Sequence, residues 1–310
     1  MTRERSSLEN EAVNGTQRSS DGRESSQFES HRRESTETTA FDEGRYIYCV
    51  VDVEAGEELE ATGIDDEPVR VITTDGIGAV VHDCDDVYDS NDHTEIHRWL
   101  LRHQSVTDEA AEAFGTPLPF QFATIFRGND EVVCEWLKAE RDNLEDALDS
   151  LAGHWEYRIE IVRTELIDAQ ALESDDDRLA ELRAEIESAT PGRKFLLESK
   201  YDDRLGRIRS DRNESIIHDV RERLETHARE VHELDPSPDT RLQTDAKRSK
   251  EGRPIGRLTV LAREDLQSDI GSVLDDVAGK PGLEVTFTGP WPPYSFTPSF
   301  GEGTNDSTEG

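Results

Sequence analysis

The sequence predicts an α+β protein of two domains, because its apolar residues repeat with the period of strands in some segments and with the period of helices in others. Short runs rich in β-branched and aromatic residues alternate with long charged segments in which apolar residues recur every three or four positions. Hairpins and long helices are mixed irregularly, which favours α+β layers over a doubly wound parallel sheet. A length of 310 residues is typical of two domains, and we place the boundary near Gly153.

The first 44 residues are mainly Ser, Thr, Glu and Arg, with almost no apolar side chains. A segment of this composition cannot bury enough surface to offset the entropy lost on ordering, so residues 1–44 are predicted to be a disordered polar tail. The N-terminal domain is expected to cover residues 45–153. A second polar tail is predicted for residues 297–310.

Three strands are predicted at the start of the N-terminal domain. Residues 45–53, 69–73 and 77–82 are runs rich in β-branched and aromatic side chains. Asp75-Gly76 lies between the last two runs and is the typical signal of a tight hairpin.

A helix is predicted for residues 92–114, because the apolar spacing changes to three and four. The residues of its apolar face are Ile96, Trp99, Leu100, His103, Val106, Ala110 and Phe114. Gly115 ends this helix, and a strand is expected at residues 120–126.

The alternation within residues 120–126 places Phe120, Phe122 and Phe126 on one face of that strand, where they are expected to be core. A second helix is then predicted between Asn129 and Gly153. Either Asn129 or Asp130 can cap its start.

The C-terminal domain is expected to cover residues 154–296 and to contain long charged helices. The predicted strands are residues 155–163, 258–262 and 283–288, and the predicted helices are residues 174–190, 193–234 and 264–278. Residues 235–254 contain Pro236, Pro238 and scattered charge, so they are predicted to form a mobile loop.

Acidic residues outnumber basic ones by 70 to 35, and the formal net charge is −35. Lysine is scarce, so arginine supplies nearly all of the positive charge, a balance typical of proteins from salt-loving organisms. Molar salt shortens the Debye length to about 3 Å, and an acid-coated fold then tolerates its self-repulsion. The same charge argues against nucleic acid and anionic membranes as partners.

Cys49, Cys84 and Cys134 are odd in number and lack CxxC spacing, which fits a reducing cytosol better than a disulfide framework. The first thirty residues have no apolar signal-peptide core, and no run of about twenty apolar residues occurs. The protein is therefore expected to be cytoplasmic.

No enzyme motif is found in the sequence, and we expect neither a cofactor nor a metal. His93 and His97 are spaced to share a metal, but Glu95 is not where a His-Glu-x-x-His motif places its glutamate. The carboxylates of residues 83–89 lack the spacing of an EF-hand. A ferredoxin-like metal-dependent enzyme or ligand sensor that uses these residues remains the alternative reading.

The most unusual segment is Gly-Pro-Trp-Pro-Pro-Tyr-Ser-Phe, residues 289–296. Its prolines predict a stiff polyproline II ribbon with Trp291 and Tyr294 on one side. Two roles remain open for this segment: it either binds a partner or covers the end of the C-terminal sheet as part of the core. The candidate residues are Trp291, Pro292, Pro293, Tyr294 and Phe296.

This octapeptide resembles the C-terminal signature of the gas vesicle GvpF/GvpL family. Residues 116–126 are similar to a second family motif of the form Leu-Pro-x-Arg-Phe-Gly-Thr, except that Gln121 replaces the arginine and Ala123 replaces the glycine. Residues 46–51, 78–81 and 191–196 fit the same family. The resemblance covers residues 45–296, and the length of the chain favours the GvpL side of the family.

The resemblance implies an N-terminal ferredoxin-like domain and a C-terminal α+β domain. It also implies a non-enzymatic accessory protein of gas vesicle assembly that contacts the shell protein GvpA and other accessory Gvp proteins, and it leaves open whether the protein stays on the finished vesicle. His103 matches a histidine that recurs in this helix in the family, where packing and hydrogen bonding suit it better than catalysis. His103, Phe120 and Phe122 join the C-terminal aromatics as candidate binding or fold-defining residues.

Overall fold

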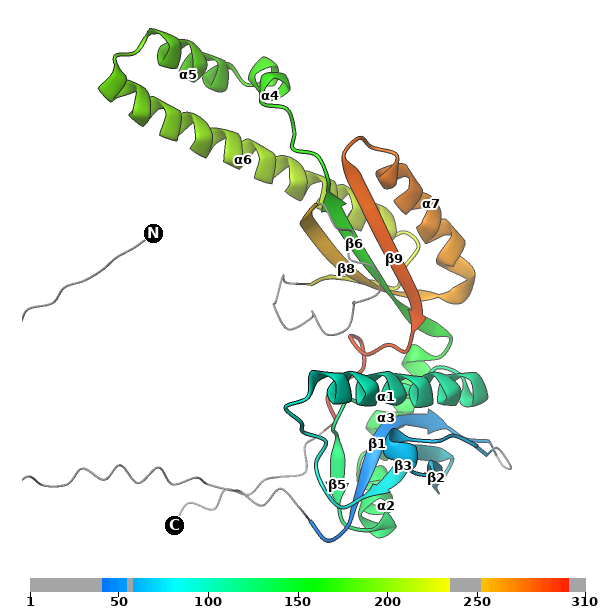
Figure 1. Ribbon diagram of the computed structural model, residues 1–310. Coiled ribbons are helices and arrows are strands. Elements are labelled where there is room, and N and C mark those ends of the chain that lie inside the picture. The colour runs from blue at the N-terminus through cyan, green and yellow to red at the C-terminus, as the bar shows by residue number, and fades with distance from the viewer. Residues whose placement is uncertain (1–40, 55–57, 235–251, 301–310) are drawn as a thin grey trace, which may run out of the picture. The chain divides into compact units, whose positions relative to one another are not determined.

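The computed structural model describes residues 41–54, 58–234 and 252–300 and contains two antiparallel sheets together with helices (Figure 1). The predicted α+β class is therefore confirmed. Most of the predicted tails and of the predicted mobile loop, namely residues 1–40, 235–251 and 301–310, lie outside the described residues.

The first sheet has the strand order β2-β3-β1-β4, with β5 also paired to β1. Its strands are β1 (Gly44–Asp52), β2 (Arg70–Thr74), β3 (Ile77–Cys84), β4 (Leu118–Pro119) and β5 (Ile125–Arg127). The predicted hairpin is confirmed, because Thr74 pairs with Ile77 across a two-residue turn. Asp75 and Gly76 both have positive φ there, 51° and 91°, as such turns require.

Helices cover both faces of this sheet (Figure 1). One face packs against α1 (His93–Phe114), and the other packs against α2 (Asp130–Ala139) and α3 (Arg141–Leu151). The prediction of a single helix from residue 129 to residue 153 was wrong, since Glu140 ends α2 and precedes α3. Neither glycine nor proline marks this break, so the sequence pattern does not reveal it.

The predicted continuous strand at residues 120–126 was also wrong. A turn at Phe122 and Ala123 separates β4 from β5, and Ala123 has a φ of 64°. Phe122 consequently packs on the α1 side of the sheet, whereas Phe120 and Phe126 pack on the side of α2 and α3. The three phenylalanines therefore do not share one face.

The second sheet has the strand order β7-β8-β6-β9. Its strands are β6 (His154–Arg163), β7 (Glu230–Glu233), β8 (Arg253–Arg263) and β9 (Leu283–Trp291), and α7 (Gln267–Ala278) connects β8 to β9. Helices lie between β6 and β7, so the order of elements in this block is β-α-β-β-α-β. The first sheet, for which the ferredoxin-like order was predicted, instead has three strands before its first helix.

Three helices lie between β6 and β7, namely α4 (Ala169–Asp175), α5 (Asp177–Ser188) and α6 (Pro191–Leu224). The predicted helix to residue 234 was wrong, because α6 ends at Leu224 and residues 230–233 form β7. Val231 of β7 pairs with Val260 and joins the sheet core, so tertiary pairing decides the conformation of this segment. Strand β8 also begins five residues before the predicted start at residue 258.

Helix α6 takes part in two separate cores. Its first half packs with α4 and α5, and we call this group, residues 169–208, the helical arm (Figure 1). Its second half packs with α7 on one face of the second sheet. The opposite face of that sheet is polar, because Glu156, Arg158 and Glu160 alternate with Tyr157 and Ile159 of the core along β6. None of the helices within the described ranges is both long and apolar enough to cross a membrane.

Candidate functional site

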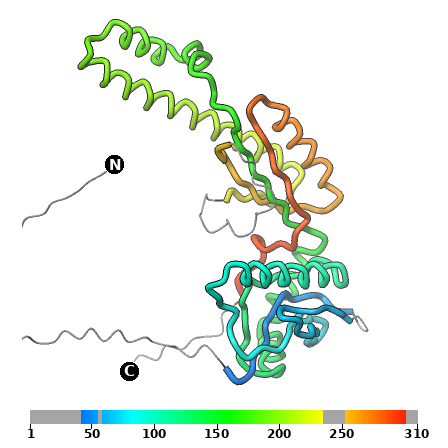
Figure 2. Tube along the Cα trace, viewed as in Figure 1, coloured from blue at the N-terminus to red at the C-terminus, as the bar shows by residue number. Residues whose placement is uncertain are grey.

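Residues 289–291 of the C-terminal motif are the end of β9, and the chain turns after them (Figure 2). The predicted polyproline II ribbon does not form. The strand runs through Gly289 and a cis peptide to Pro290, and Trp291 still pairs with Glu156. Gly289 has a φ of 127°, and a Cβ at this position would lie 2.8 Å from the carbonyl oxygen of Glu156. Glycine is therefore needed for both the backbone angle and the close approach.

A compact turn follows the strand. The Tyr294 N–H donates to the Pro292 carbonyl at 2.8 Å, and the N–H groups of Phe296 and Thr297 donate to the Pro293 carbonyl at 3.0 Å. Pro292 and Pro293 are buried. The polyproline II repeat of three residues predicted that Trp291 and Tyr294 lie on one side of the segment. That prediction was wrong, because the chain turns between them.

A buried carboxylate holds the turn to the second sheet. Glu156 is fully buried, and its carboxylate accepts hydrogen bonds from the Ser295 N–H at 2.7 Å and from the Ser295 hydroxyl at 3.0 Å. Arg158 donates to the same carboxylate at 2.8 Å. The arginine compensates the buried negative charge, and the two serine bonds then fix the position of the C-terminal segment.

Tyr294 connects the C-terminal motif to helix α1. Its hydroxyl donates to the Thr107 hydroxyl oxygen at 3.5 Å, and Thr107 in turn donates to the His103 carbonyl at 3.0 Å. The ring centroids of Tyr294 and His103 lie 6.4 Å apart. Those of Phe122 and His103 lie 6.2 Å apart, with the two rings in a T-shaped arrangement. Three predicted candidates from distant parts of the chain therefore meet at this point.

His103 is the centre of a buried hydrogen-bond relay. Its Nε2 lies 3.1 Å from the Phe120 carbonyl, which can only accept, so Nε2 carries the hydrogen. Its Nδ1 then accepts from the Tyr46 hydroxyl at 2.8 Å, and Tyr46 accepts from the Ala123 N–H at 3.2 Å. A neutral imidazole satisfies every group in this relay.

A second relay of the same form lies beside the first, since the rings of Tyr46 and His82 stack at 4.8 Å. His82 contacts the Tyr48 hydroxyl through Nδ1 at 2.7 Å and the Tyr88 hydroxyl through Nε2 at 2.8 Å. Tyr48 also accepts the Ile64 N–H at 3.0 Å. A neutral ring donates to one tyrosine and accepts from the other.

Burial lowers the pKa of both histidines from 6.5 to about 4. Burial likewise raises the pKa of Tyr46, Tyr48 and Tyr294 well above the usual value of 10. At neutral pH the network is thus uncharged, and both nitrogens of each histidine are occupied. It is suited to holding α1, β1, β3 and the C-terminal segment in place.

The rings of Phe296 and Phe120 pack on aromatic residues outside this network. The ring of Phe296 packs on His232 at 4.7 Å. Phe120 lies 5.8 Å from Trp136 and 6.2 Å from Phe300. Trp291 is half-buried at the end of β9.

Sequence reasoning missed Tyr46, Tyr48, His82, Tyr88 and Glu156. One signal was available for the first two, since Tyr46 and Tyr48 are two residues apart on a predicted strand and both lie on its α1 side. Nothing in the local sequence points to His82 or to Glu156. Their partners are supplied by other segments.

The residues of the alternative metal-site reading are not brought together. His93 and His97 are exposed on the first turns of α1. Asp83 forms ion pairs with Arg45 at 3.1 Å and with Arg70 at 2.7 Å. Across the described ranges, no three His, Cys, Asp or Glu side chains are grouped so that they could hold a metal ion.

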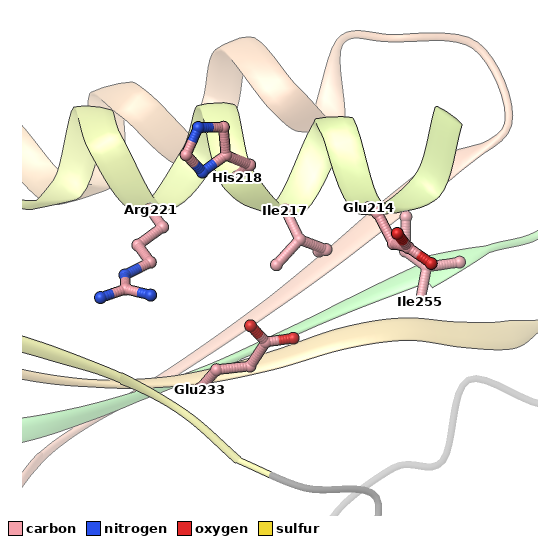
Figure 3. A pocket seen from close by; sticks show the side chains of 6 residues that line it. All are labelled: Glu214, Ile217, His218, Arg221, Glu233 and Ile255. Atoms are coloured by element: carbon pink, nitrogen blue, oxygen red, sulfur yellow. The ribbon is translucent and has the colours of Figure 1, made fainter. Parts of the chain in front are cut away.

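Two shallow cavities lie away from the network. One of about 130 Å³ lies between α6 and the second sheet (Figure 3). It is lined by Glu214, Ile217, His218 and Arg221 of the helix and by Glu233 and Ile255 of the sheet. The other, of about 230 Å³, is lined mainly by carboxylates beside the β2–β3 hairpin; its acidic residues are Asp52, Asp75, Glu145 and Asp149. None of the predicted candidate residues lines either cavity.

Residues 44–298 match the model of the family described as gas vesicle synthesis protein GvpL/GvpF. The chain is 44% identical over 263 residues to gas vesicle protein L2 of Halobacterium salinarum, an alignment that covers 83% of this chain and 92% of that protein. It is 33% identical to gas vesicle protein L of Haloferax mediterranei, over 94% of this chain and 99% of the relative.

The fold is similar to the crystal structure of the gas vesicle protein GvpF from Anabaena. The TM-score is 0.63 at 22% identity, and the superposition covers 83% of this chain and 98% of the other. At this identity the likeness describes the fold alone.

Proposed function

Because the chain belongs to the gas vesicle GvpL/GvpF family, we propose that it is a non-enzymatic accessory protein of gas vesicle assembly. The observation that carries this proposal is the family match, which spans both sheets and ends just after the C-terminal motif. No described group of side chains favours a catalytic role over this one.

The proposed partners are the shell protein GvpA and other accessory Gvp proteins. An apolar shell subunit aggregates readily in strong salt, because salting-out strengthens apolar association. A partner with a net charge of −35 stays dissolved under the same conditions and can hold such a subunit before it is incorporated. We place this activity in the cytoplasm, in association with the forming vesicle.

We further propose that residues 45–153 and 154–296 act as two domains. Each contains its own sheet, and most of the apolar residues of each sheet pack within one block, which supports this division. Leu261 of β8 is an exception, because it packs with the cluster of the first block. We propose a ferredoxin-like arrangement for the second block, which its β-α-β-β-α-β order supports.

For the C-terminal motif we propose a fold-defining role at Tyr294 and a partner-binding role at Trp291. Tyr294 is bonded to Thr107, and the neighbouring Ser295 is bonded to the buried Glu156. Trp291 is half-buried at the end of β9, where its backbone pairs with Glu156. The two aromatic residues therefore differ in how strongly the fold depends on them.

A pull-down in molar salt tests the partner proposal, with the full chain as bait and GvpA and the accessory Gvp proteins as separate prey. We expect retention of GvpA or of at least one accessory protein. Retention of none of them would contradict the proposal.

The variants Trp291→Ala and Tyr294→Ala test the division of roles. Trp291→Ala should reduce prey retention at an unchanged unfolding midpoint, whereas Tyr294→Ala should lower the stability by about 3 kcal/mol, as for a large aromatic removed from a packed site. Circular dichroism during urea unfolding reports stability. Equal destabilisation by both variants would show that Trp291 also belongs to the core.

A further inference from the structure

Strand β9 is an open edge of the second sheet. It is last in the strand order β7-β8-β6-β9, and within the described part of the chain β6 is the strand that pairs with it (Figure 1). An edge strand leaves a row of backbone N–H and C=O groups that another strand can bind. The edge formed by residues 283–288 has no role in the function proposed above.

This edge lacks the protection that exposed edges usually have. Edge strands are commonly short or carry charged side chains, which prevent pairing with another chain. At the other edge of the same sheet, β7 has four residues and two of them are glutamates, and β2 in the first sheet has five residues. In contrast, β9 has nine residues with Glu284 as its one charged side chain, although 34% of the whole chain is charged. Strand β9 is therefore long and almost uncharged on a heavily charged protein.

The register with β6 shows which backbone groups of β9 point outward. The Thr164 N–H donates to the Gly282 carbonyl at 3.0 Å, and the pairing then continues without a shift across residues 283–288. Because alternate residues of an antiparallel strand bond to the same neighbour, the even-numbered residues of this stretch bond to β6. The N–H and C=O groups of Val285 and Phe287 consequently point away from the sheet.

The side chains of the same stretch differ between its two faces. Val285 and Phe287 pack against the core of the second sheet but are only half-buried. On the opposite face, Thr286 and Glu284 are exposed and Thr288 is half-buried. A strand added at this edge would cover apolar area on one face and would meet a threonine at the centre of the other.

We propose that two copies of this chain pair through β9, antiparallel and around a two-fold axis at Thr286. Thr286 of one copy then lies opposite Thr286 of the other, and Val285 of each copy lies opposite Phe287 of the other. The outward N–H and C=O groups of these two residues are all paired in this register. A β-branched side chain opposite an aromatic one is also favourable, and Glu284 faces Thr288, so no like charges meet.

The neighbouring registers satisfy fewer of these groups. A register centred on Val285 places Phe287 opposite Leu283, whose N–H already donates to the Lys280 carbonyl at 3.3 Å. A register centred on Phe287 places Val285 opposite Gly289, whose φ of 127° departs from strand geometry. The two-fold axis is therefore assigned to the residue between them.

Strong salt favours this association. Two copies with a net charge of −35 each repel one another in dilute buffer, but molar salt shortens the Debye length to about 3 Å. The same salt strengthens contacts between apolar side chains. The pairing involves copies of this chain alone, so it does not depend on the Gvp partners proposed above.

Sedimentation equilibrium of the full chain in molar KCl, over a range of protein concentrations, tests the pairing. We expect a reversible dimer of 35.0 kDa chains. Thr286→Lys places two lysines opposite each other and should raise the dissociation constant at least about tenfold, which corresponds to about 1.4 kcal/mol. Thr73→Lys is the matched control, since it makes the same substitution at an exposed position of β2 and should leave the dimer unchanged.

Engineered cysteines test the register. In an antiparallel pair, opposite residues that exchange no hydrogen bonds have Cα atoms about 4.5 Å apart, which is close enough for a disulfide. Mild oxidation in molar KCl should therefore link two copies of Thr286→Cys. Glu284→Cys and Thr288→Cys should not link to themselves but should link to each other when mixed. The wild type under the same oxidant measures the background from its native cysteines.

Three results would overturn the inference. They are a folded monomer at every concentration in molar KCl, a dimer that Thr286→Lys leaves intact, and a Thr286→Cys link no more abundant than the link formed by Glu284→Cys. Circular dichroism verifies that each variant is folded. A pull-down that retains none of the Gvp proteins would contradict the proposed function and would leave this pairing untouched.

Discussion

At the scale of single residues, the best-defined feature is a pair of buried histidines that must stay neutral. Protonated His103 would carry a hydrogen on Nδ1, which now accepts from Tyr46, and Tyr46 is already bonded to the Ala123 N–H. His82 lies between two tyrosine hydroxyls in a similar way. A proton on either ring breaks a bond and adds an unpaired buried charge.

We predict that stability falls as the pH is lowered from about 6.5 to about 4. The folded-state pKa of His82 and His103 is lowered to about 4, so within this window the unfolded chain binds protons that the folded protein does not. Above pH 6.5, the pKa of histidine in the unfolded chain, the full stability is present. By about pH 4, the pKa in the folded protein, each histidine has lowered the free energy of unfolding by about 3 kcal/mol. Carboxylates with a lowered pKa, such as Asp130, lose their contribution to stability only below the ordinary aspartate pKa of 3.8.

Urea unfolding in molar salt across this pH range measures the effect. His103→Gln should keep a donor to Phe120 and an acceptor for Tyr46 and should remove about half of the pH dependence. His93→Gln, at an exposed position, is the matched control and should change nothing. An equal slope in the wild type and in His103→Gln would refute the prediction.

Ala123 is a second residue whose conformation has a measurable consequence. Its φ of 64° is in the left-handed region, which costs an alanine about 1 kcal/mol relative to glycine. Ala123→Gly should therefore stabilise the protein by up to about 1 kcal/mol. The reverse change can be made at Gly76, which has a φ of 91° and open space where a Cβ would lie. Gly76→Ala should destabilise the protein by a similar amount. The urea unfolding midpoint measures the effect of both variants. A loss of stability in Ala123→Gly would show that the Ala123 methyl group contributes packing that outweighs the strain.

At the scale of elements, α6 connects two cores along one helix of 34 residues. Leu197, Tyr201 and Leu205 belong to the arm, whereas Ile217, Val220 and Leu224 belong to the sheet. Between these two stripes the helix depends more on its own backbone propensity. Single substitutions in this stretch should therefore report helix stability directly.

Gly206 is an exposed glycine in this part of α6, and a Cβ there would meet no atom within 4 Å. Gly206→Ala should raise the stability by about 1 kcal/mol, because alanine loses less backbone entropy in a helix. Gly256→Ala is the matched contrast, since its Cβ would clash with the Ile217 side chain and should destabilise the sheet core. Thermal unfolding followed by circular dichroism distinguishes the two, and equal midpoints for both variants would contradict this account.

At the scale of the whole molecule, net charge is the dominant property. With a formal charge of −35, carboxylate repulsion opposes the compact state unless counter-ions screen it. Relatives from Halobacterium salinarum and Haloferax mediterranei share the fold family, so the acidic surface is interpreted as an adaptation to strong salt.

We predict that the thermal midpoint falls steeply when the salt is diluted from molar to about 0.1 M, where the Debye length grows from about 3 Å to about 10 Å. Circular dichroism scans over a series of KCl concentrations measure this. Sucrose at matched water activity is the control, because it does not screen charge. A midpoint independent of salt would mean that local ion pairs, such as Arg45 with Asp130, already balance the repulsion.

Much of the fold could be predicted from near-neighbour patterns. The β2–β3 hairpin, α1 and α7 agree with expectation because turn residues and apolar periodicity act over a few positions. The errors occurred where a distant partner decides the outcome. Residues 230–233 became a strand because they pair with β8, and residues 120–126 were divided by a turn whose Ala123 N–H bonds to Tyr46.

The sequence by itself determined the α+β class, the acidic composition and the family resemblance that the C-terminal motif carries, since composition and motifs are properties of the chain alone. Only the tertiary structure decided what that motif contacts. Tyr294 reaches Thr107 across 187 positions, and Tyr46 reaches His103 across 57. Contacts of this kind form only when the elements pack together, because the local conformational preference of one residue does not specify its distant partner.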